Sequence, residues 1–420
     1  MFNKSKEILC SVLLLILFMA FAISAAAVET VKVGAIYPLT GSISPLGINC
    51  MNAVKLAAEI VNNSYDMSLS LAKTVGLPGL GGAKIEVIFA DSQGTPINGQ
   101  AEAERLITKQ NVVGIVGCYQ SSVAITISKV CEREKVCFIG SDVVADSLTD
   151  PGYKYFFRPS VTNYTYSKVI FDFMKVLNES GAGLKTVALV YENTEYGVNN
   201  ATIQEKMAQE YGFDVVLSLS YTSNSTDLSS EVQRLKVANP DAIMHSAYAS
   251  DAILFTKTYK SQNYAPNLIF APGAGFAIPT YFENVGDDGN YVINSVAWNI
   301  DLVKSNPSAK KVADLYYEKY GKTLDDVSAR SFIGAMVMFM AIDKAGSTDT
   351  DKIQEALLET DIDASELIAT WGVKFDPKTH ENVRVSAVLI QNLDQRGQVI
   401  WPFEAKVADY IMPVPAWTDR

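Results

Sequence analysis

Apolar positions recur along the chain with two periods, one of two residues and one near 3.6 residues. Segments with the first period alternate with segments that have the second. In the N-terminal third, apolar β-branched runs alternate with amphipathic runs. This order is typical of parallel βαβ units, which place helices on both faces of a twisted sheet. The predicted strands are 31–40, 84–91, 112–118 and 136–141, and the predicted helices are 52–63, 99–110 and 122–134.

The alternation stops at "DPGYKYFFRPSVTN", residues 150–163, and then begins again. After the break comes a second set of alternating strands and helices, and a helical region at 308–346 follows that set. The stripe of Met and Phe residues in this helical region indicates core packing. One doubly wound domain seldom needs this many units, so the sequence predicts an α/β fold with two doubly wound parallel-sheet lobes. The second set comprises strands 186–193, 214–221, 242–248 and 267–275, and helices 200–212, 228–240 and 250–262.

The first residues are typical of a targeting segment. Lys4 and Lys6 give a positive start, residues 8–23 form an apolar run, and "SAAAVET" carries the small-residue cleavage pattern. We expect residues 1–27 to be a signal peptide, and the mature protein to be exported to the periplasm or the outer face of the cell membrane. An uncleaved anchor is the alternative, and it is disfavoured because the apolar run is short for a bilayer span.

Composition and charge exclude several classes of protein. The chain has a formal net charge of −11 and no dense block of Lys or Arg, so we expect no nucleic-acid partner. His245 and His380 do not combine with the cysteines at any familiar metal-binding spacing, and we expect no metal and no cofactor. The glycine-rich stretch "GLPGLGG" lacks the Lys and Ser or Thr of a phosphate loop. We interpret its surroundings, residues 62–84, as a surface excursion.

The sequence also lacks a recognisable catalytic motif. It has no G-x-S-x-G nucleophile elbow, although a pair of carboxylates brought together by folding stays open as an alternative. We therefore expect a protein that is not an enzyme. Beyond residue 27, four cysteines allow three pairings in an oxidising compartment. Their local positions favour two bonds, Cys131 with Cys137 and Cys50 with Cys118.

Several stretches along the chain together resemble one protein family. They resemble, in order and in spacing, the solute-binding proteins of ABC importers of the leucine-binding, type 1 periplasmic class. The resemblance implies two lobes joined by three crossovers, a ligand closed between the lobes, and a membrane permease as partner. The stretches are "VKVGAIYPLTGSISPLG", "FADSQGTP", "GIVGCYQSS", "VALVYENTEYG", "SEVQRLKVANPDAI" and "WPFEAKVADYIMPVPAW".

The resemblance also divides the chain between the lobes. We expect 28–157 and 297–374 to form lobe 1, and 158–296 and 375–420 to form lobe 2. The crossovers are then expected near 157–161, 296–299 and 375–385, with the final hairpin against lobe 2.

The stretch "GIVGCYQSS" predicts part of the ligand site on physical grounds. In parallel α/β sheets, small ligands bind beyond the carboxyl ends of the strands. A helix that begins at Ser121 or Ser122 offers free backbone N–H groups and a hydroxyl to a carboxylate, without an arginine. The alternative is that these serines only cap their own helix.

Further site residues follow from the resemblance, position by position. The loop "GSDVVADS" makes Ser141 and Asp142 candidates for polar ligand contacts, whereas Val144 replaces the small or hydroxyl residue that the family usually has. The loops "NTEYG" and "SAYASD" match tyrosine-bearing loops of the family at Tyr196 and Tyr248.

Two positions depart from the family pattern. Family members that bind α-amino acids commonly carry Asp or Glu where this chain has Gly273, and an aromatic residue where it has Leu46. Either another acid pairs with the ligand's ammonium group, or the ligand is not an α-amino acid. An Asp introduced at position 273 is then expected to strengthen amino-acid binding. The candidate substitutes for the missing acid are Asp142, Asp251 and Glu195.

The function expected from the resemblance is capture of a branched-chain or other hydrophobic amino acid for an ABC permease. A non-amino organic acid, aromatic or aliphatic, or an amide is the alternative ligand. A sensor that signals to a membrane partner is the alternative function. Transport is favoured because no transmembrane segment and signalling domain follow the binding lobes before the sequence ends at "AWTDR".

Overall fold

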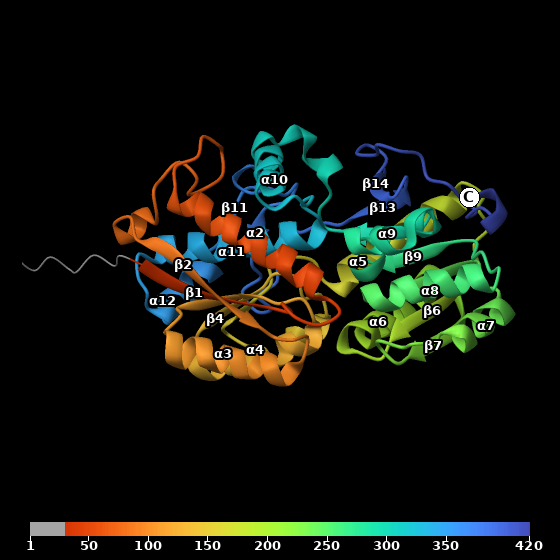
Figure 1. Ribbon diagram of the computed structural model, residues 1–420, viewed down its shortest axis with the longest axis horizontal. Coiled ribbons are helices and arrows are strands. Elements are labelled where there is room, and N and C mark those ends of the chain that lie inside the picture. Colours follow the sequence, from red (N-terminus) through yellow and green to blue (C-terminus); the bar gives the residue numbers. More distant parts are fainter. Residues whose placement is uncertain (1–29) are drawn as a thin grey trace, which may run out of the picture.

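The structure, a computed structural model, describes residues 30–420 as two α/β lobes that lie side by side (Figure 1). The predicted signal peptide, residues 1–27, lies outside the described residues. None of the helices in the described range has the length and apolar character of a membrane span. The predicted fold class, two α/β lobes on largely parallel sheets, is confirmed.

Lobe 1 is built on a parallel sheet with the strand order β2-β1-β3-β4-β5. Helices α3 and α4 cover one face, and α2, α11 and α12 cover the other, so the central strands are buried on both sides. The elements are β1 (Thr30–Tyr37), α2 (Ser44–Asn62), β2 (Lys84–Asp91), α3 (Pro96–Gln110), β3 (Gly114–Gly117), α4 (Ser121–Glu134), β4 (Cys137–Gly140), β5 (Phe156–Phe157), α10 (Pro307–Tyr320), α11 (Asp326–Ala345), α12 (Thr350–Leu358), and the small pair β11 (Asp361–Ile362) and β12 (Val373–Lys374).

Lobe 2 contains a mixed sheet with the order β14-β13-β10-β9-β8-β6-β7. The strands from β10 to β7 are parallel, and the final hairpin adds β13 and β14 as antiparallel strands at one edge. The elements are α5 (Asn163–Glu179), β6 (Thr186–Glu192), α6 (Glu195–Tyr211), β7 (Asp214–Tyr221), α7 (Ser229–Ala238), β8 (Ala242–Ser246), α8 (Ala249–Ser261), β9 (Ile269–Pro272), α9 (Pro279–Val285), β10 (Ile293–Val296), β13 (Val388–Leu393) and β14 (Arg396–Trp401).

Within residues 30–420 the chain passes between the lobes three times. The first and third crossovers run side by side, since Arg158 N donates to His380 O at 3.0 Å and Asn382 N donates to Arg158 O at 3.0 Å. The second crossover follows β10, and the carboxylate of Asp326 holds it: Ala297 N and Trp298 N both donate to Asp326 Oδ1 at 2.8 Å. A group at the start of α11 therefore fixes the hinge.

Several element boundaries differ from the sequence-based expectation. Helix α5 was not predicted, α2 begins at Ser44 rather than residue 52, and the helical region 308–346 is divided into α10 and α11. The first turn of α2 contains Pro45 and Gly47. Because both residue types are typical of turns and loops, the apolar periodicity does not predict a helix there. The segment 62–84, expected to be a surface excursion, is partly buried. Its residues Met67, Leu69 and Leu77 pack against the core of lobe 1.

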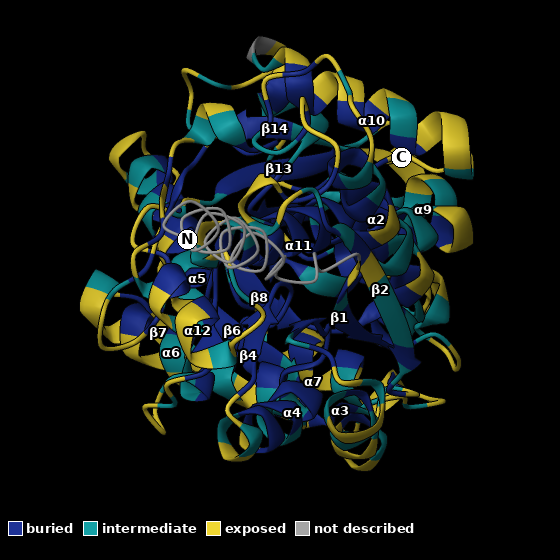
Figure 2. Cartoon of the chain, turned by 90° about the vertical axis from the view of Figure 1, so that its left-hand side faces the viewer, coloured by how far each residue is buried: buried dark blue, intermediate teal, exposed yellow. Residues whose placement is uncertain are grey.

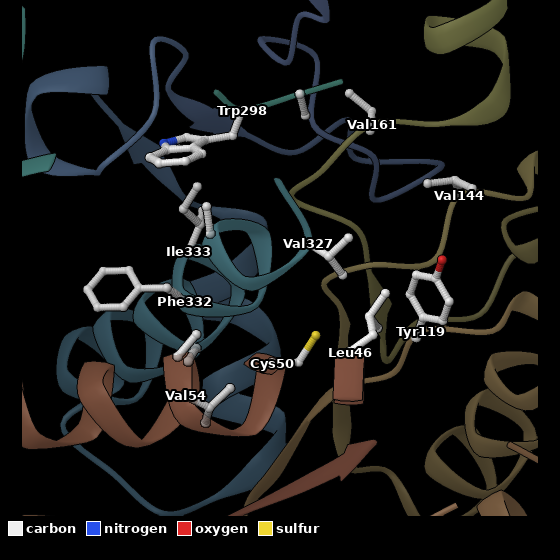
Figure 3. Close-up of a cluster of buried hydrophobic side chains, with 14 of the residues drawn as sticks. Leu46, Cys50, Val54, Tyr119, Val144, Val161, Trp298, Val327, Phe332 and Ile333 are labelled. Atoms are coloured by element: carbon white, nitrogen blue, oxygen red, sulfur yellow. The ribbon is translucent and has the colours of Figure 1, made fainter. Parts of the chain in front are cut away.

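The core follows the two faces of each sheet. Figure 2 shows dark-blue strands inside a shell of helices with exposed yellow faces. In Figure 3, Cys50 and Val54 of α2, Phe332 and Ile333 of α11 and Trp298 of the second crossover belong to one apolar cluster. This cluster also contains Tyr119 of lobe 1 and Tyr248 of lobe 2, so it continues from one lobe into the other.

The two expected disulfides are wrong. All four cysteines between residues 30 and 420 are buried free thiols. Cys50 and Cys137 belong to the apolar cluster on the α2 face of the lobe 1 sheet, whereas Cys118 and Cys131 belong to the cluster on the α4 face. The sheet therefore separates the members of both expected pairs, and short separation along the chain did not bring their sulfur atoms together.

We predict that these thiols are unreactive until the protein unfolds, because burial raises the pKa of each and excludes reagents. Alkylation with iodoacetamide followed by mass spectrometry should modify the four residues in denaturant but not in native buffer. A reducing agent should leave the melting temperature unchanged. A drop in melting temperature on reduction would contradict the free-thiol arrangement.

Candidate functional site

A cavity lies between the lobes at the carboxyl ends of strands from both sheets, where parallel α/β folds hold ligands. Its walls lie close together and leave a volume of about 10 Å³, roughly the room that one water molecule needs. The lining comprises Tyr119, Ser121, Asp142, Val144 and Arg330 of lobe 1 and Tyr166, Tyr196, Tyr248, Pro272 and Ala274 of lobe 2.

A larger groove, with a volume of about 460 Å³, runs beside the second crossover. Its charged side chains already have partners: Lys322 pairs with Glu283 at 3.2 Å, and Arg396 pairs with Asp301 at 3.1 Å. In the described chain, no buried side-chain atom of this groove lacks a hydrogen-bond partner. The interlobe cavity, which does have such atoms, is therefore the stronger candidate for ligand binding.

The turn between β3 and α4 gives the cavity its first polar wall. Helix α4 begins at Ser121, and its N-cap residue Gln120 makes no side-chain cap. Ser121 is buried, and its Oγ accepts from Ala145 N at 3.3 Å, which leaves the hydroxyl hydrogen free to donate. The helix N-terminus and this hydroxyl both suit an anionic ligand group.

Asp142, just after β4, gives the second polar wall. Its Oδ2 accepts from Ser141 Oγ and Ser331 Oγ, both at 2.6 Å, whereas its Oδ1 has no hydrogen-bond partner among the described residues. Burial raises the pKa of Asp142 to about 6, although the nearby Arg330 guanidinium and the two hydroxyl donors act in the opposite direction. Asp142 is thus a buried carboxyl group whose Oδ1 lies within ion-pair distance of Arg330 but accepts no hydrogen bond in the described chain.

Arg330 of α11 is the cationic group of the cavity, and the sequence analysis missed it. Its Nε donates to Asp326 Oδ2 at 3.1 Å, and its Nη1 lies 3.6 Å from Asp142 Oδ1 without forming a hydrogen bond to any described residue. The side chain is 3% exposed. An arginine four residues after an aspartate, in a helix that is otherwise apolar for several turns, is the signal that could have identified it.

Tyrosines form most of the remaining wall. Tyr196 and Tyr248 stack with ring centroids 5.2 Å apart, and Tyr119 of lobe 1 lies 5.2 Å from Tyr248 across the interface between the lobes. Tyr196 Oη donates to Pro272 O at 2.9 Å, and Tyr166 Oη donates to Asp326 Oδ2 at 3.3 Å. Tyr119, inside the motif "GCYQSS", is a cavity residue that the sequence analysis did not predict.

The structure places the predicted site residues in three groups. Ser121, Asp142, Tyr196 and Tyr248 line the cavity, as does Val144. Ser141 lies behind Asp142 and positions it, with Tyr37 Oη 3.1 Å from its Oγ. The remaining three do not line the cavity: Ser122, Leu46 and Gly273.

Two of the three candidate substitutes for the missing acid lie elsewhere. Asp251 accepts from Asn224 N at 3.0 Å, and Glu195 accepts from Ser147 Oγ at 2.5 Å. Neither lines the cavity, in contrast to Asp142.

Gly273 occupies a backbone conformation that only glycine adopts readily, with φ 66° and ψ −151°. A Cβ atom there would lie 3.0 Å from the ring of Tyr166. Tyr166 therefore fills the space that an acidic side chain would need, and the expected gain in amino-acid binding from Gly273→Asp is no longer predicted.

Comparisons with known proteins agree with the observed fold. The sequence model of the periplasmic binding protein family matches residues 30–397, and the chain belongs to that family, in its leucine-binding-like, type 1 class. It is 29% identical over 403 residues to the Leu/Ile/Val-binding protein homolog 7 of Brucella abortus (strain 2308), which covers 93% of this chain and 96% of that protein.

Two solved structures show the same fold. The branched-chain amino acid transporter substrate-binding protein LivJ of Streptococcus pneumoniae, in complex with isoleucine, has a TM-score of 0.75 and 18% identity, covering 92% of this chain and 100% of that chain. An ABC transporter solute-binding protein of Rhodopseudomonas palustris BisB5, in complex with 3,4-dihydroxybenzoic acid, has a TM-score of 0.74 and 21% identity, covering 93% and 100%.

We predict that Gly273→Ala destabilises the protein by about 2–4 kcal/mol, because the strained backbone and the contact with the Tyr166 ring both oppose the new methyl group. Gly286→Ala is the matched control: its φ of 56° and ψ of −136° are similar, but nothing lies within 4 Å of the added Cβ. Urea unfolding should show a smaller loss for the control, about 1–3 kcal/mol. Equal losses would mean that Tyr166 does not restrict this position.

Proposed function

We propose that this protein is the solute-binding component of an ABC importer, and that its ligand is a small organic carboxylate held between the two lobes. The observation that carries the proposal is Arg330, a buried arginine of the interlobe cavity whose Nη1 forms an ion pair with Asp142 at 3.6 Å but makes no hydrogen bond within the described chain. A buried cation is stabilised by an anion with good hydrogen-bond geometry. The Ser121 hydroxyl and the N-terminus of α4 add donors on the same side.

The arrangement also explains how a ligand would favour closure. The polar groups of the cavity belong to lobe 1, whereas lobe 2 supplies Tyr166, Tyr196 and Tyr248. A ligand bound to lobe 1 by its charged end presents its apolar end to these rings, and burial of that end favours the closed form. Hinge closure then forms one composite surface for a membrane permease.

The ligand class includes the amino acid expected from the resemblance. A branched-chain or other hydrophobic amino acid carries a carboxylate and an apolar side chain, as does an aromatic acid without an amine. Proteins of the same fold are in complex with ligands of both kinds. Tyrosine faces pack against aliphatic and aromatic groups alike.

We predict that small carboxylates raise the melting temperature of the protein and that matched amides do not, since a ligand that binds only the folded state stabilises it. A thermal-shift screen should include hydrophobic amino acids, their deaminated analogues, aromatic acids and the corresponding amides. A shift with amides and none with acids would contradict the role of Arg330.

We predict that Arg330→Lys weakens binding of the carboxylate found in that screen by about 10- to 100-fold, because lysine keeps the charge but loses the planar set of N–H donors. Isothermal titration calorimetry measures the change. Arg105→Lys is the control, since Arg105 lies on the surface of α3 and pairs with Glu102 at 2.7 Å. The control should bind as tightly as the unmodified protein, and an equal loss in both variants would remove Arg330 from the site.

A further inference from the structure

The loop that follows β4 first lines the interlobe cavity and then continues to lobe 2. Asp142 and Val144 of this loop are cavity residues. Residues 144–147 make four hydrogen bonds to the N-terminal parts of α5 and α6, which belong to lobe 2. We call residues 144–147 the interlobe segment, because its bonds join one lobe to the other.

Two of the four bonds go to α5, which directly follows the first crossover. Asn163 N donates to Val144 O at 2.7 Å, and Tyr164 N donates to Asp146 Oδ2 at 3.1 Å. Both N–H groups belong to the first turn of α5, where the helix itself offers no acceptor, and a carboxylate is favourable at a helix N-terminus. These two bonds therefore fix the interlobe segment to lobe 2 beside the hinge.

The other two bonds go to α6, which is not part of any crossover. Asp146 N donates to Asn199 Oδ1 at 3.1 Å, and Ser147 Oγ donates to Glu195 Oε1 at 2.5 Å. Asn163 Nδ2 also donates to Asn199 Oδ1, at 2.8 Å, so the contacts to α5 and α6 form one network. A rotation that separates the lobes breaks the two bonds to α6.

The interlobe segment is also anchored to lobe 1 and to the hinge. Arg158 of the first crossover is fully buried, and its Nη1 donates to Ala145 O at 2.6 Å, while its Nη2 pairs with Glu381 of the third crossover. On the opposite side of the same peptide, Ala145 N donates to Ser121 Oγ at 3.3 Å. Because the segment is held in this way, it does not follow α6 when lobe 2 moves.

We propose that the interlobe segment is a latch, which holds the two lobes together and must release before the cavity exchanges its solute. The cavity has a volume of about 10 Å³, so a solute with several heavy atoms passes only after the lobes separate. Ser147, Glu195 and Asn199 are not among the residues that line the cavity. The inference rests on the proposed function, and it concerns when the solute exchanges rather than how the solute is recognised.

The first test measures lobe separation without any solute. Ile97→Cys in lobe 1 and Val237→Cys in lobe 2 place thiols at positions that are 81% and 79% exposed, and nitroxide labels react there because the cysteines of the described chain are buried. Double electron–electron resonance then gives the distribution of distances between the labels. Ser147→Ala combined with Asn199→Ala removes both bonds to α6 and should raise the ratio of separated to closed molecules about 5- to 100-fold.

The matched control removes two hydrogen bonds that stay within lobe 2. Ser250 Oγ donates to Asn224 Oδ1 at 3.1 Å, and Asn284 Nδ2 donates to Thr280 O at 2.8 Å. Ser250→Ala combined with Asn284→Ala should leave the distance distribution unchanged. An unchanged distribution in the Ser147 and Asn199 variant, or an equal change in the control, overturns the latch.

A second variant tests the contact between Ser147 and Glu195 by charge. Ser147→Asp places a carboxylate against Glu195, and repulsion between the two should separate the lobes. Adding Glu195→Lys replaces the repulsion with an ion pair and should restore the closed distribution. Such a rescue distinguishes a latch from a residue that only supports the folding of its own loop. If the second substitution does not restore the closed distribution, the latch is overturned.

Solute exchange is followed by stopped-flow kinetics with two probes, the hydrophobic amino acid isoleucine and the aromatic acid 3,4-dihydroxybenzoate. The variant that lacks both bonds to α6 should release a bound probe about 5- to 100-fold faster than the unmodified protein. An equal release rate overturns the latch and leaves carboxylate capture intact. If neither probe binds, the proposed function loses its support, and the distance measurement without solute still decides the latch.

Discussion

The carboxylate of Asp326 joins the hinge to the ligand cavity, and the rest of the site depends on it. One oxygen accepts from the backbone of Ala297 and Trp298 in the second crossover. The other accepts from Tyr166 of lobe 2 and from Arg330 of lobe 1. A single buried acid thus contacts both lobes, a crossover and the cationic group of the cavity. A rotation of one lobe against the other would change these contacts, which connects the hinge directly to the charged side chain of Arg330 in the cavity.

The cavity divides its chemistry between the lobes. Lobe 1 holds the groups that need fixed geometry, Asp142 and Arg330, on a strand end and a long buried helix. Lobe 2 supplies tyrosine rings, which contact apolar groups without strict directional demands. A charged end can therefore be bound by lobe 1 alone, and the area buried when lobe 2 closes adds to the stability of the closed form. The contact between Tyr119 and Tyr248 is part of the interface between the two lobes.

Four buried thiols illustrate how the sheet organises the interior of lobe 1. Successive residues of β4 point to opposite faces, so Cys137 enters the α2 side and Phe138 enters the α4 side. Cys131 lies on the α4 side although it precedes Cys137 by only a few residues. The same alternation that makes strands visible in the sequence keeps these cysteines apart.

The sequence by itself determined most of the strands and helices up to β9, the division into two lobes and the placing of Ser121, Asp142, Tyr196 and Tyr248 at strand ends. The strand ends follow from local periodicity and from the rule that loops at the carboxyl ends of parallel strands gather at one edge. The choice of Asp142, Tyr196 and Tyr248 as site residues followed from the resemblance to the family. Arg330 could not be placed in the same way, since the first part of lobe 2, from α5 to β10, separates α11 from β3 and β4 along the chain. Only the return of the chain through the second crossover brings that arginine beside Asp142. The steric conflict between an acidic side chain at position 273 and the ring of Tyr166 was likewise decided by the tertiary structure. The two residues are distant in sequence, and only the packing of the folded chain brings them into contact.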